Sequence, residues 1–314
     1  MPPVLATILF FTSVSRFLDV VNCAATPSPV QTIKNLSNAD FIPNQNYSTG
    51  FVTVVTAYYQ IPSKRPHANY LRWIENFLPN IPCYLYIFTS SAMYPTLKTM
   101  RMKHLNSTRF IIKGFEELEE YSKMHHWRRI KSTDYEKYHT PELYIIWNQK
   151  WRFVEQAIKE NVFRSEYFVW CDIGAFRKAE FVPHLIQFPD PDVLRRKLPD
   201  QNKIALAILH PFNTNRDRVY ENGSLSISLR EGRTDHSAAG LMAGHEKAWG
   251  IFIREYFSMQ AYFFAQGLNA GKDQNIVNAV IMKFPENFQL LTSVAYFNGT
   301  GDAWFYLEYY LTHA

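Results

Sequence analysis

The chain has 314 residues, of which 47% are hydrophobic and 19% are charged, against roughly 25% charged residues in an average soluble domain. This composition excludes a mostly disordered chain and favours a large apolar core. The net charge of +5, from 33 Lys and Arg against 28 Asp and Glu, is too small an excess to indicate nucleic-acid binding. Three cysteines exclude a disulfide-rich scaffold. Only 12 glycines occur, with neither G-x-x-x-x-G-K-[ST] nor G-x-G-x-x-G, so glycine-rich phosphate loops are excluded as well.

The N-terminal segment differs in composition from the rest of the chain. Its first 15 residues carry no charged side chain, and an apolar run over residues 4–14 is followed by small residues at 23–25. We predict that residues 1–25 are a signal peptide or, as the alternative, a short signal anchor. Residues 26–48 are polar and punctuated by proline, which predicts a stem or linker. No apolar stretch reaches 18 residues, so we expect no strong transmembrane helix.

Glycosylation sequons favour the same compartment as the N-terminal segment. Five N-x-[ST] sequons begin at Asn35, Asn46, Asn106, Asn222 and Asn298, whereas roughly two are expected by chance for this composition. Together the two signals predict a glycoprotein of the secretory-pathway lumen (Golgi or ER) or a secreted protein. Disulfides are permitted there, so the state of the cysteines has to be argued from the fold.

Apolar periodicity predicts alternating strands and helices from residue 51 onward. Strands are expected over residues 51–59, 83–88, 109–112, 166–171 and 204–209, and helices over 70–78 and 140–160. The second helix begins with Thr140 as N-cap, Pro141 in the first turn and Glu142 at the positive end of the helix dipole. A short buried strand over 238–243 and two helices, beginning near Trp249 and at Asp273, complete the pattern.

The alternation of strands and helices predicts an α/β domain over residues 49–314, with a mainly parallel, mixed sheet flanked by helices in a Rossmann-like arrangement. If the first four strands lie in the order 3-2-1-4, strand one separates the strands that carry Cys83 and Cys171. The two cysteines then lie about 10 Å apart or more. A disulfide requires Cα atoms within about 7 Å, so we predict two buried free thiols.

The active site of such a sheet is expected beyond the C-terminal ends of the strands, near Tyr58, Thr89 and Asp172. Asp172 directly follows an apolar strand and is placed to bind a divalent cation or a ribose hydroxyl; capping a turn is the alternative. Arg65, in the loop after the first strand, suits pairing with a diphosphate. Lys150 lies on the helix leading toward the Asp172 strand. It either reaches phosphates or snorkels to solvent from an apolar face.

The C-terminal third supplies further candidates. Asp235 precedes a small-residue strand in which Gly240 permits close approach of a ligand, although a tight turn with exposed polar residues also fits. Asp273, with Gln274 beside it, is either a helix cap or a cleft carboxylate. His245 is a third residue able to bind a metal, with a surface or helix-start position as the alternative.

Three segments follow one another in an order that is typical of a known superfamily. They are residues 170–174 (Trp-Cys-Asp-Ile-Gly), 238–242 (Ala-Ala-Gly-Leu-Met) ahead of Trp249, and 273–278 (Asp-Gln-Asn-Ile-Val-Asn). This order resembles nucleotide-sugar glycosyltransferases of the GT-A fold. These have an Asp-x-Asp after a strand, an Ala-Gly strand followed by Trp or Phe, and an Asp-Gln-x-x-x-Asn helix. Residues 51–291 resemble more closely the HtrL/YibB-like family, which is assigned to the same superfamily. The resemblance implies a single GT-A-like domain.

The resemblance also implies roles for individual residues. Asp172 matches the first carboxylate of Asp-x-Asp, but Gly174 stands at the second, which usually holds the cation. Either Asp273 or His245 completes a Mn²⁺ or Mg²⁺ site with Asp172, or cationic side chains act without a metal. The implied donor-binding residues are Asp172, Gly174, Arg65, Lys150, Ala239, Gly240 and Gln274, and the implied catalytic carboxylates near the acceptor hydroxyl are Asp235 and Asp273.

The function predicted from these residues is a glycosyltransferase that moves a sugar from a nucleotide-sugar donor to a glycan or glycoconjugate acceptor. Gly174 favours an alternative from another class. In that alternative the protein is a catalytically silent GT-A-like protein that binds a glycan or a nucleotide sugar without transfer.

Overall fold

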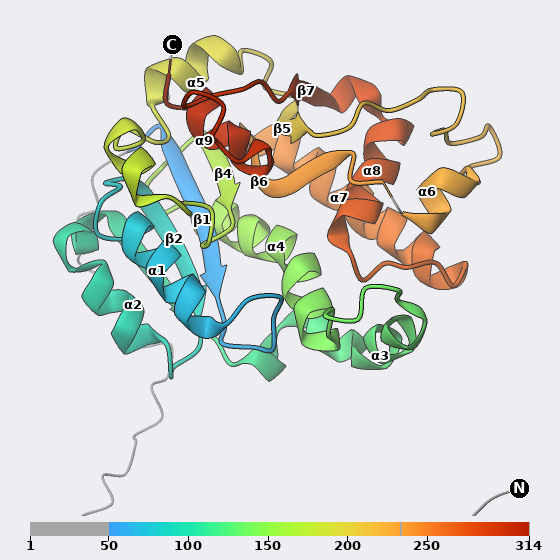
Figure 1. Ribbon diagram of the computed structural model, residues 1–314, viewed down its shortest axis with the longest axis horizontal. Coiled ribbons are helices and arrows are strands. Elements are labelled where there is room, and N and C mark those ends of the chain that lie inside the picture. Colours follow the sequence, from blue (N-terminus) through green and yellow to red (C-terminus); the bar gives the residue numbers. More distant parts are fainter. Residues whose placement is uncertain (1–49, 233, 314) are drawn as a thin grey trace, which may run out of the picture. The chain divides into compact units, whose positions relative to one another are not determined.

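The computed structural model describes residues 50–232 and 234–313, so the predicted signal segment (1–25) and stem (26–48) lie outside the described residues. The described part holds a sheet flanked by helices (Figure 1). Its strands are β1 (Val52–Tyr58), β2 (Tyr84–Thr89), β3 (Thr108–Ile112), β4 (Tyr167–Cys171), β5 (Ile204–Ile208), β6 (Ser237–His245) and β7 (Phe288–Thr292). Its α-helices are α1 (His67–Phe77), α2 (Tyr94–Met100), α3 (Met124–Thr133), α4 (Pro141–Glu160), α5 (Pro191–Lys197), α6 (Ile227–Glu231), α7 (Glu246–Ala265), α8 (Asp273–Lys283) and α9 (Tyr306–Tyr310).

The strands form one mixed sheet in the order β3-β2-β1-β4-β6-β5-β7. The first four strands pair in parallel in the order 3-2-1-4, which is the order that the argument about the two cysteines assumed. β6 pairs antiparallel with both β4 and β5, and β7 pairs parallel with β5. Among the described strands β6 therefore runs against all the others, and the predicted α/β fold with a mainly parallel, mixed sheet is confirmed.

Helices cover both faces of the sheet, and the side chains of β1 alternate between the two layers. Val55 and Ala57 pack into the core formed with α3, α4, α7 and α8. Val54 and Tyr58 pack into the opposite core, formed with α1, α2, α5 and α9. Aromatic rings fill much of both layers, for example Trp151 against Phe252 at 5.1 Å between ring centroids. The aromatic content of the chain is therefore mainly core material.

The start of α4 is built as the sequence predicts. The Thr140 hydroxyl accepts a hydrogen bond from the backbone N–H of Leu143 at 3.2 Å, and Pro141 occupies the first turn. The helix ends at Glu160, and the C-cap residue Asn161 takes the left-handed conformation with φ of 35°. α4 has 20 residues, and its buried face carries Lys150 under the C-terminal edge of the sheet.

Cys83 and Cys171 are buried free thiols, as predicted. Cys83 directly precedes β2 and Cys171 ends β4, and β1 lies between these two strands. None of the described helices has the length and apolar character needed to cross a membrane.

Candidate functional site

A cleft lies where β1 and β4 end, at the predicted edge of the sheet. Its polar lining residues are Ser63, Arg65, His67, Lys150, Asp172 and Arg177, and its aromatic ones are Tyr58, Tyr59, Tyr70, Trp147, Trp170 and Phe305. Tyr58 and Asp172, which the sequence analysis expects at this edge, both line the cleft. Thr89 is buried outside this lining and donates its hydroxyl hydrogen to the carbonyl of Tyr58 at 2.8 Å.

Lys150 joins two carboxylates at the base of the cleft. Its Nζ lies 3.2 Å from Asp172 Oδ1 and 3.0 Å from Asp273 Oδ2, and it donates to the carbonyl of Ala239 at 3.3 Å. The side chain is only 4% exposed, so the snorkelling alternative is wrong. Burial acts to lower the pKa of Lys150, but the charges of Asp172 and Asp273 raise it by more than burial lowers it. The pKa therefore lies above its usual value, and the ammonium stays charged.

Contacts with β4 and β6 hold Asp172 between Lys150 and the cleft. Its backbone N–H donates to the carbonyl of Gly240 at 2.8 Å, and Trp170 Nε1 donates to its Oδ1 at 2.9 Å. A Cβ on residue 240 would lie 3.2 Å from Asp172 Oδ2 and 2.9 Å from Trp304 Nε1. Gly240 therefore permits the close approach of β6 to the carboxylate. A third of the Asp172 side chain is exposed, so it faces both Lys150 and the cleft.

Gly174 stands where a second carboxylate would complete Asp-x-Asp, and the packing there leaves no room for one. A Cβ on residue 174 would lie 2.9 Å from Trp73 Cε3. Further along the same loop, Arg177 lines the cleft instead. Its guanidinium lies 4.5 Å from the Phe305 ring centroid and pairs with Asp302 at 3.0 Å. The loop after β4 thus offers one carboxylate and one guanidinium.

The remaining donor-side candidates divide into two groups. Arg65 is exposed and lines the cleft together with Gly174. Ala239 is buried and contributes its carbonyl to Lys150. Gln274 is buried, lies outside the cleft lining and donates its amide hydrogen to the carbonyl of Ser237, so its amide N–H holds α8 to β6.

The two predicted acceptor-side carboxylates occupy different environments. Asp273, in the first turn of α8, is 7% exposed and pairs with Lys150. Asp235 is 44% exposed, lies outside the cleft lining and pairs with Lys272 at 2.6 Å.

The prediction that His245 completes a metal site with Asp172 is wrong. His245 ends β6 and pairs with Tyr167 at the start of β4, whereas Asp172 follows the end of β4. Antiparallel pairing thus places the two residues at opposite edges of the sheet. The His245 ring packs edge-on against Tyr167, and its Nδ1 accepts from the N–H of Lys247 at 3.2 Å, which caps α7. Burial lowers the pKa of His245.

Several lining residues were not predicted from the sequence, and Arg177, His67 and Phe305 show why. Arg177 follows Asp172 in the same strand-end loop, so the argument that selected Arg65 would have found it. His67 begins α1, and its Nδ1 lies 2.5 Å from the Tyr58 hydroxyl. Phe305 comes from the C-terminal segment, for which no local signal existed.

A further group able to bind a metal lies in the loop between α3 and α4. Asp134, Glu136 and His139 each offer a ligand atom, and these atoms lie within 4.8 Å of one another. No motif in the sequence points to this group, because a spacing of two and three residues matches no standard metal motif.

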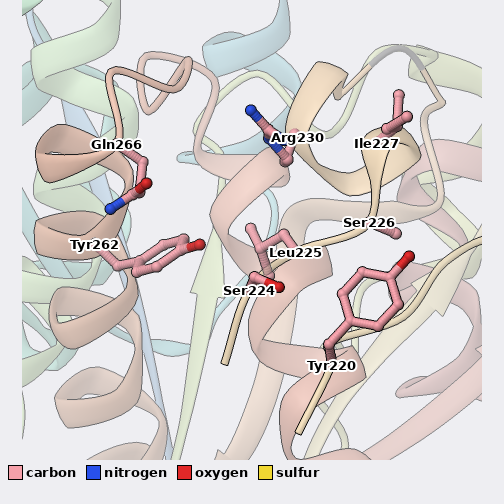
Figure 2. A pocket seen from close by; sticks show the side chains of 8 residues that line it. All are labelled: Tyr220, Ser224, Leu225, Ser226, Ile227, Arg230, Tyr262 and Gln266. Atoms are coloured by element: carbon pink, nitrogen blue, oxygen red, sulfur yellow. The ribbon is translucent and has the colours of Figure 1, made fainter. Parts of the chain in front are cut away.

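A second pocket, shown in Figure 2, is lined by none of Lys150, Asp172 and Asp273. Tyr262 on α7 and Gln266, which directly follows that helix, face the loop and short helix that carry Tyr220, Ser224, Leu225, Ser226, Ile227 and Arg230. Arg230 is its one charged lining residue, and none of the predicted site residues reaches it. The cleft at Asp172 is therefore the candidate active site.

Comparison with known proteins identifies a family. The family described as "Bacterial protein of unknown function (HtrL_YibB)" matches residues 49–307. No curated protein matches the sequence. Two solved structures have similar folds. The first is the apo form of mouse xyloside xylosyltransferase 1, which is 10% identical over 81% of this chain and 93% of that chain, with a TM-score of 0.42. The second is 4-diphosphocytidyl-2C-methyl-D-erythritol synthase from Anaerococcus prevotii DSM 20548, which is 10% identical over 84% of this chain and 96% of that chain, with a TM-score of 0.32. Similarity this low says nothing about the site. The family match covers most of the sequence, and the chain belongs to the HtrL/YibB family.

Proposed function

We propose that this protein is a glycosyltransferase that moves a sugar from a nucleotide-sugar donor to a glycan or glycoconjugate acceptor. The observation that carries the proposal is the buried Lys150 held between Asp172 and Asp273 at the base of a cleft that Arg65 and Arg177 also line. A carboxylate and several cations at the C-terminal edge of a mainly parallel sheet suit a ligand with hydroxyls and phosphates.

The transfer breaks the bond between the sugar C1 and the diphosphate oxygen and forms a bond from C1 to the acceptor oxygen. The leaving diphosphate gains negative charge, which the cations of the cleft stabilise. Asp172 accepts hydrogen bonds from donor hydroxyls, while Asp273 holds the Lys150 ammonium in place. A base must take the acceptor's proton. Of the two predicted carboxylates Asp235 is the accessible one, so we assign it this role.

The cleft does not fit a cation held by Asp-x-Asp. Trp73 fills the space that a second carboxylate at position 174 needs, and Lys150 Nζ already lies between the two carboxylates present. In the proposed reaction Arg65 and Arg177, both of which line the cleft, therefore neutralise the diphosphate in place of Mn²⁺ or Mg²⁺.

The test uses a panel of nucleotide sugars, read by thermal shift and by donor hydrolysis, on the wild type, Asp172→Asn and the control Asp192→Asn. Asp192 is 78% exposed and pairs with Arg195, outside the cleft lining. We expect one donor to raise Tm and to be hydrolysed slowly, equally with Mn²⁺ and with EDTA. Asp172→Asn should lower turnover about 100-fold or more, with Tm in the absence of donor within a few degrees of wild type, because Asp273 still pairs with Lys150.

Unchanged turnover in Asp172→Asn contradicts the assignment of the site. A donor or glycan that raises Tm without any hydrolysis or transfer supports the alternative, a catalytically silent binding protein.

We also propose that the protein acts in the secretory-pathway lumen. Three sequon asparagines in the described part, Asn106, Asn222 and Asn298, are exposed, as N-glycosylation requires. Expression in eukaryotic cells followed by endoglycosidase treatment checks this proposal. Retention of the same electrophoretic mobility after treatment would contradict it.

A further inference from the structure

The loop between α3 and α4 holds a buried histidine with one unused nitrogen. The His139 side chain is fully buried, and its Nδ1 lies 2.8 Å from Asp134 Oδ2. Its Nε2 is buried and has no hydrogen-bond partner. A carboxylate at Nδ1 fixes the tautomer with hydrogen on Nδ1, which leaves the lone pair on Nε2.

The unused nitrogen of His139 faces a carboxylate oxygen. Glu136 Oε2 lies 3.5 Å from His139 Nε2, while Oε1 of the same carboxylate accepts from the Tyr138 hydroxyl. Two atoms with lone pairs thus face each other without a hydrogen bond between them. Two ligand atoms of a tetrahedral metal, with bonds of about 2.1 Å, lie about 3.4 Å apart. The observed separation matches that geometry.

Asp134 holds both His139 and Glu136 in place through hydrogen bonds. Its Oδ1 accepts from the backbone N–H of Glu136 at 2.9 Å, and its Oδ2 accepts from the Tyr144 hydroxyl as well as from His139 Nδ1. A carboxylate that orients a metal-binding imidazole through its other nitrogen is the usual outer-shell arrangement.

Two lysines are the competing cations. Lys272 Nζ lies 3.6 Å from Glu136 Oε2 but only 2.6 Å from Asp235 Oδ1, so Asp235 is its main partner. Lys64 lies over the rings of Tyr138 and Trp147, at 4.7 and 5.5 Å from their centroids. Two further lysines at this loop are held by backbone oxygens and not by these carboxylates: Lys131 Nζ donates to the carbonyl of Lys137 at 2.9 Å, and Lys137 Nζ donates to that of Asp134 at 3.4 Å.

We propose that His139 Nε2 and Glu136 Oε2 bind a divalent d-block cation of the Zn²⁺ type, with Asp134 orienting the imidazole and with water in the remaining positions. An imidazole nitrogen with a carboxylate oxygen suits Zn²⁺, whereas Mg²⁺ and Ca²⁺ prefer all-oxygen sites. The His139 ring packs edge-on against Trp147 at 4.9 Å, and Trp147 lines the cleft. The bound cation would thus order the rim of the cleft. This proposal does not depend on glycosyl transfer.

The experiment measures Zn²⁺ bound per chain after EDTA treatment, reloading and desalting, together with Tm before and after reloading. The variants are Glu136→Gln and His139→Gln. The matched control is Glu155→Gln, whose side chain is 51% exposed and pairs with Arg152 on α4. We expect about one Zn²⁺ per chain and a rise in Tm on reloading in the wild type and the control. Both effects should be lost in Glu136→Gln and His139→Gln, with affinity lowered about 100-fold or more.

Co²⁺ provides a spectroscopic check, since a tetrahedral site gives intense visible bands that the same two variants should abolish. If His139→Gln fails to fold, Glu136→Gln still decides, because the Glu136 carboxylate is partly exposed and Gln keeps an oxygen for Tyr138. Equal Zn²⁺ content and equal Tm response in wild type and Glu136→Gln would overturn the proposal. Failure of the wild type to retain Zn²⁺ would overturn it as well.

Discussion

Two lysines of this molecule lie between two carboxylates each, and they differ in their access to water. Lys150 is 4% exposed and lies 3.2 and 3.0 Å from the oxygens of Asp172 and Asp273, the second of which is 7% exposed. Lys272 lies 2.6 Å from Asp235, which is 44% exposed, and 3.6 Å from Glu136. The charge pattern is the same at both places. At Lys272 water can replace a lost partner, whereas at Lys150 a lost partner leaves a buried charge uncompensated.

The largest expected effect on stability comes from removing Lys150, and the same change at Lys272 is the comparison. Lys150→Met leaves the buried Asp273 without its cation, so we expect a loss of about 3–5 kcal/mol in the free energy of unfolding. Lys272→Met leaves carboxylates that water reaches, so we expect a loss of about 1 kcal/mol or less. Urea denaturation of both variants, with m-values compared to wild type, measures the difference. Equal losses in the two variants would show that access to water does not distinguish the two clusters.

The parts of the fold predicted correctly are those that local sequence determines. The start of α4 follows from Thr140 and Pro141, and the first four strands follow from apolar runs with short helical connections. The direction of β6 has no local signal, because an antiparallel and a parallel strand of small residues look alike. For that reason the sequence could not exclude His245 as a metal ligand beside Asp172, although the two residues lie at opposite edges of the sheet.

The candidate site was predicted in part for the same reason. Asp172 and Arg65 follow strands, so the general rule for parallel sheets located them. The apolar surroundings of Lys150 were correctly inferred from Trp147 and Trp151, but where its ammonium lies depends on Asp273. That residue comes from a helix more than 100 positions away in the sequence. Contacts between distant elements of this kind are decided by tertiary packing and not by any local pattern.

Glu308 extends the comparison to a buried carboxyl group that, unlike Asp273, is not paired with Lys150. It is 4% exposed, its Oε1 has no hydrogen-bond partner, and burial, followed by the charge of Asp302, raises its pKa well above the usual value. Since the folded-state pKa lies above the unfolded one, its contribution to stability is complete below about pH 4.3 and is lost as pH rises through the folded-state value.

Glu308→Gln should therefore stabilise the protein near pH 7 and leave it unchanged near pH 4. Each kcal/mol gained corresponds to about 2–4 °C in Tm for a domain of this size. Thermal unfolding from pH 4 to pH 8 checks the slope, with the exposed Glu155→Gln as the control for loss of a carboxylate. A Tm shift that is the same at every pH would mean that the carboxyl group is not the cause.

The smallest effect on stability is expected at Asp235, and it separates stability from function. Asp235→Asn weakens an ion pair in which Asp235 is 44% exposed and Lys272 is 12% exposed, and Lys272 keeps Glu136 nearby. We therefore expect a loss of about 1 kcal/mol or less that shrinks in 1 M salt, where charges are screened within about 3 Å. If Asp235 takes the acceptor's proton, transfer to an acceptor should fall while donor hydrolysis, which depends on Asp172 and Lys150, stays near the wild-type rate. A parallel fall in both rates would instead place Asp235 on the donor side, together with the buried cluster.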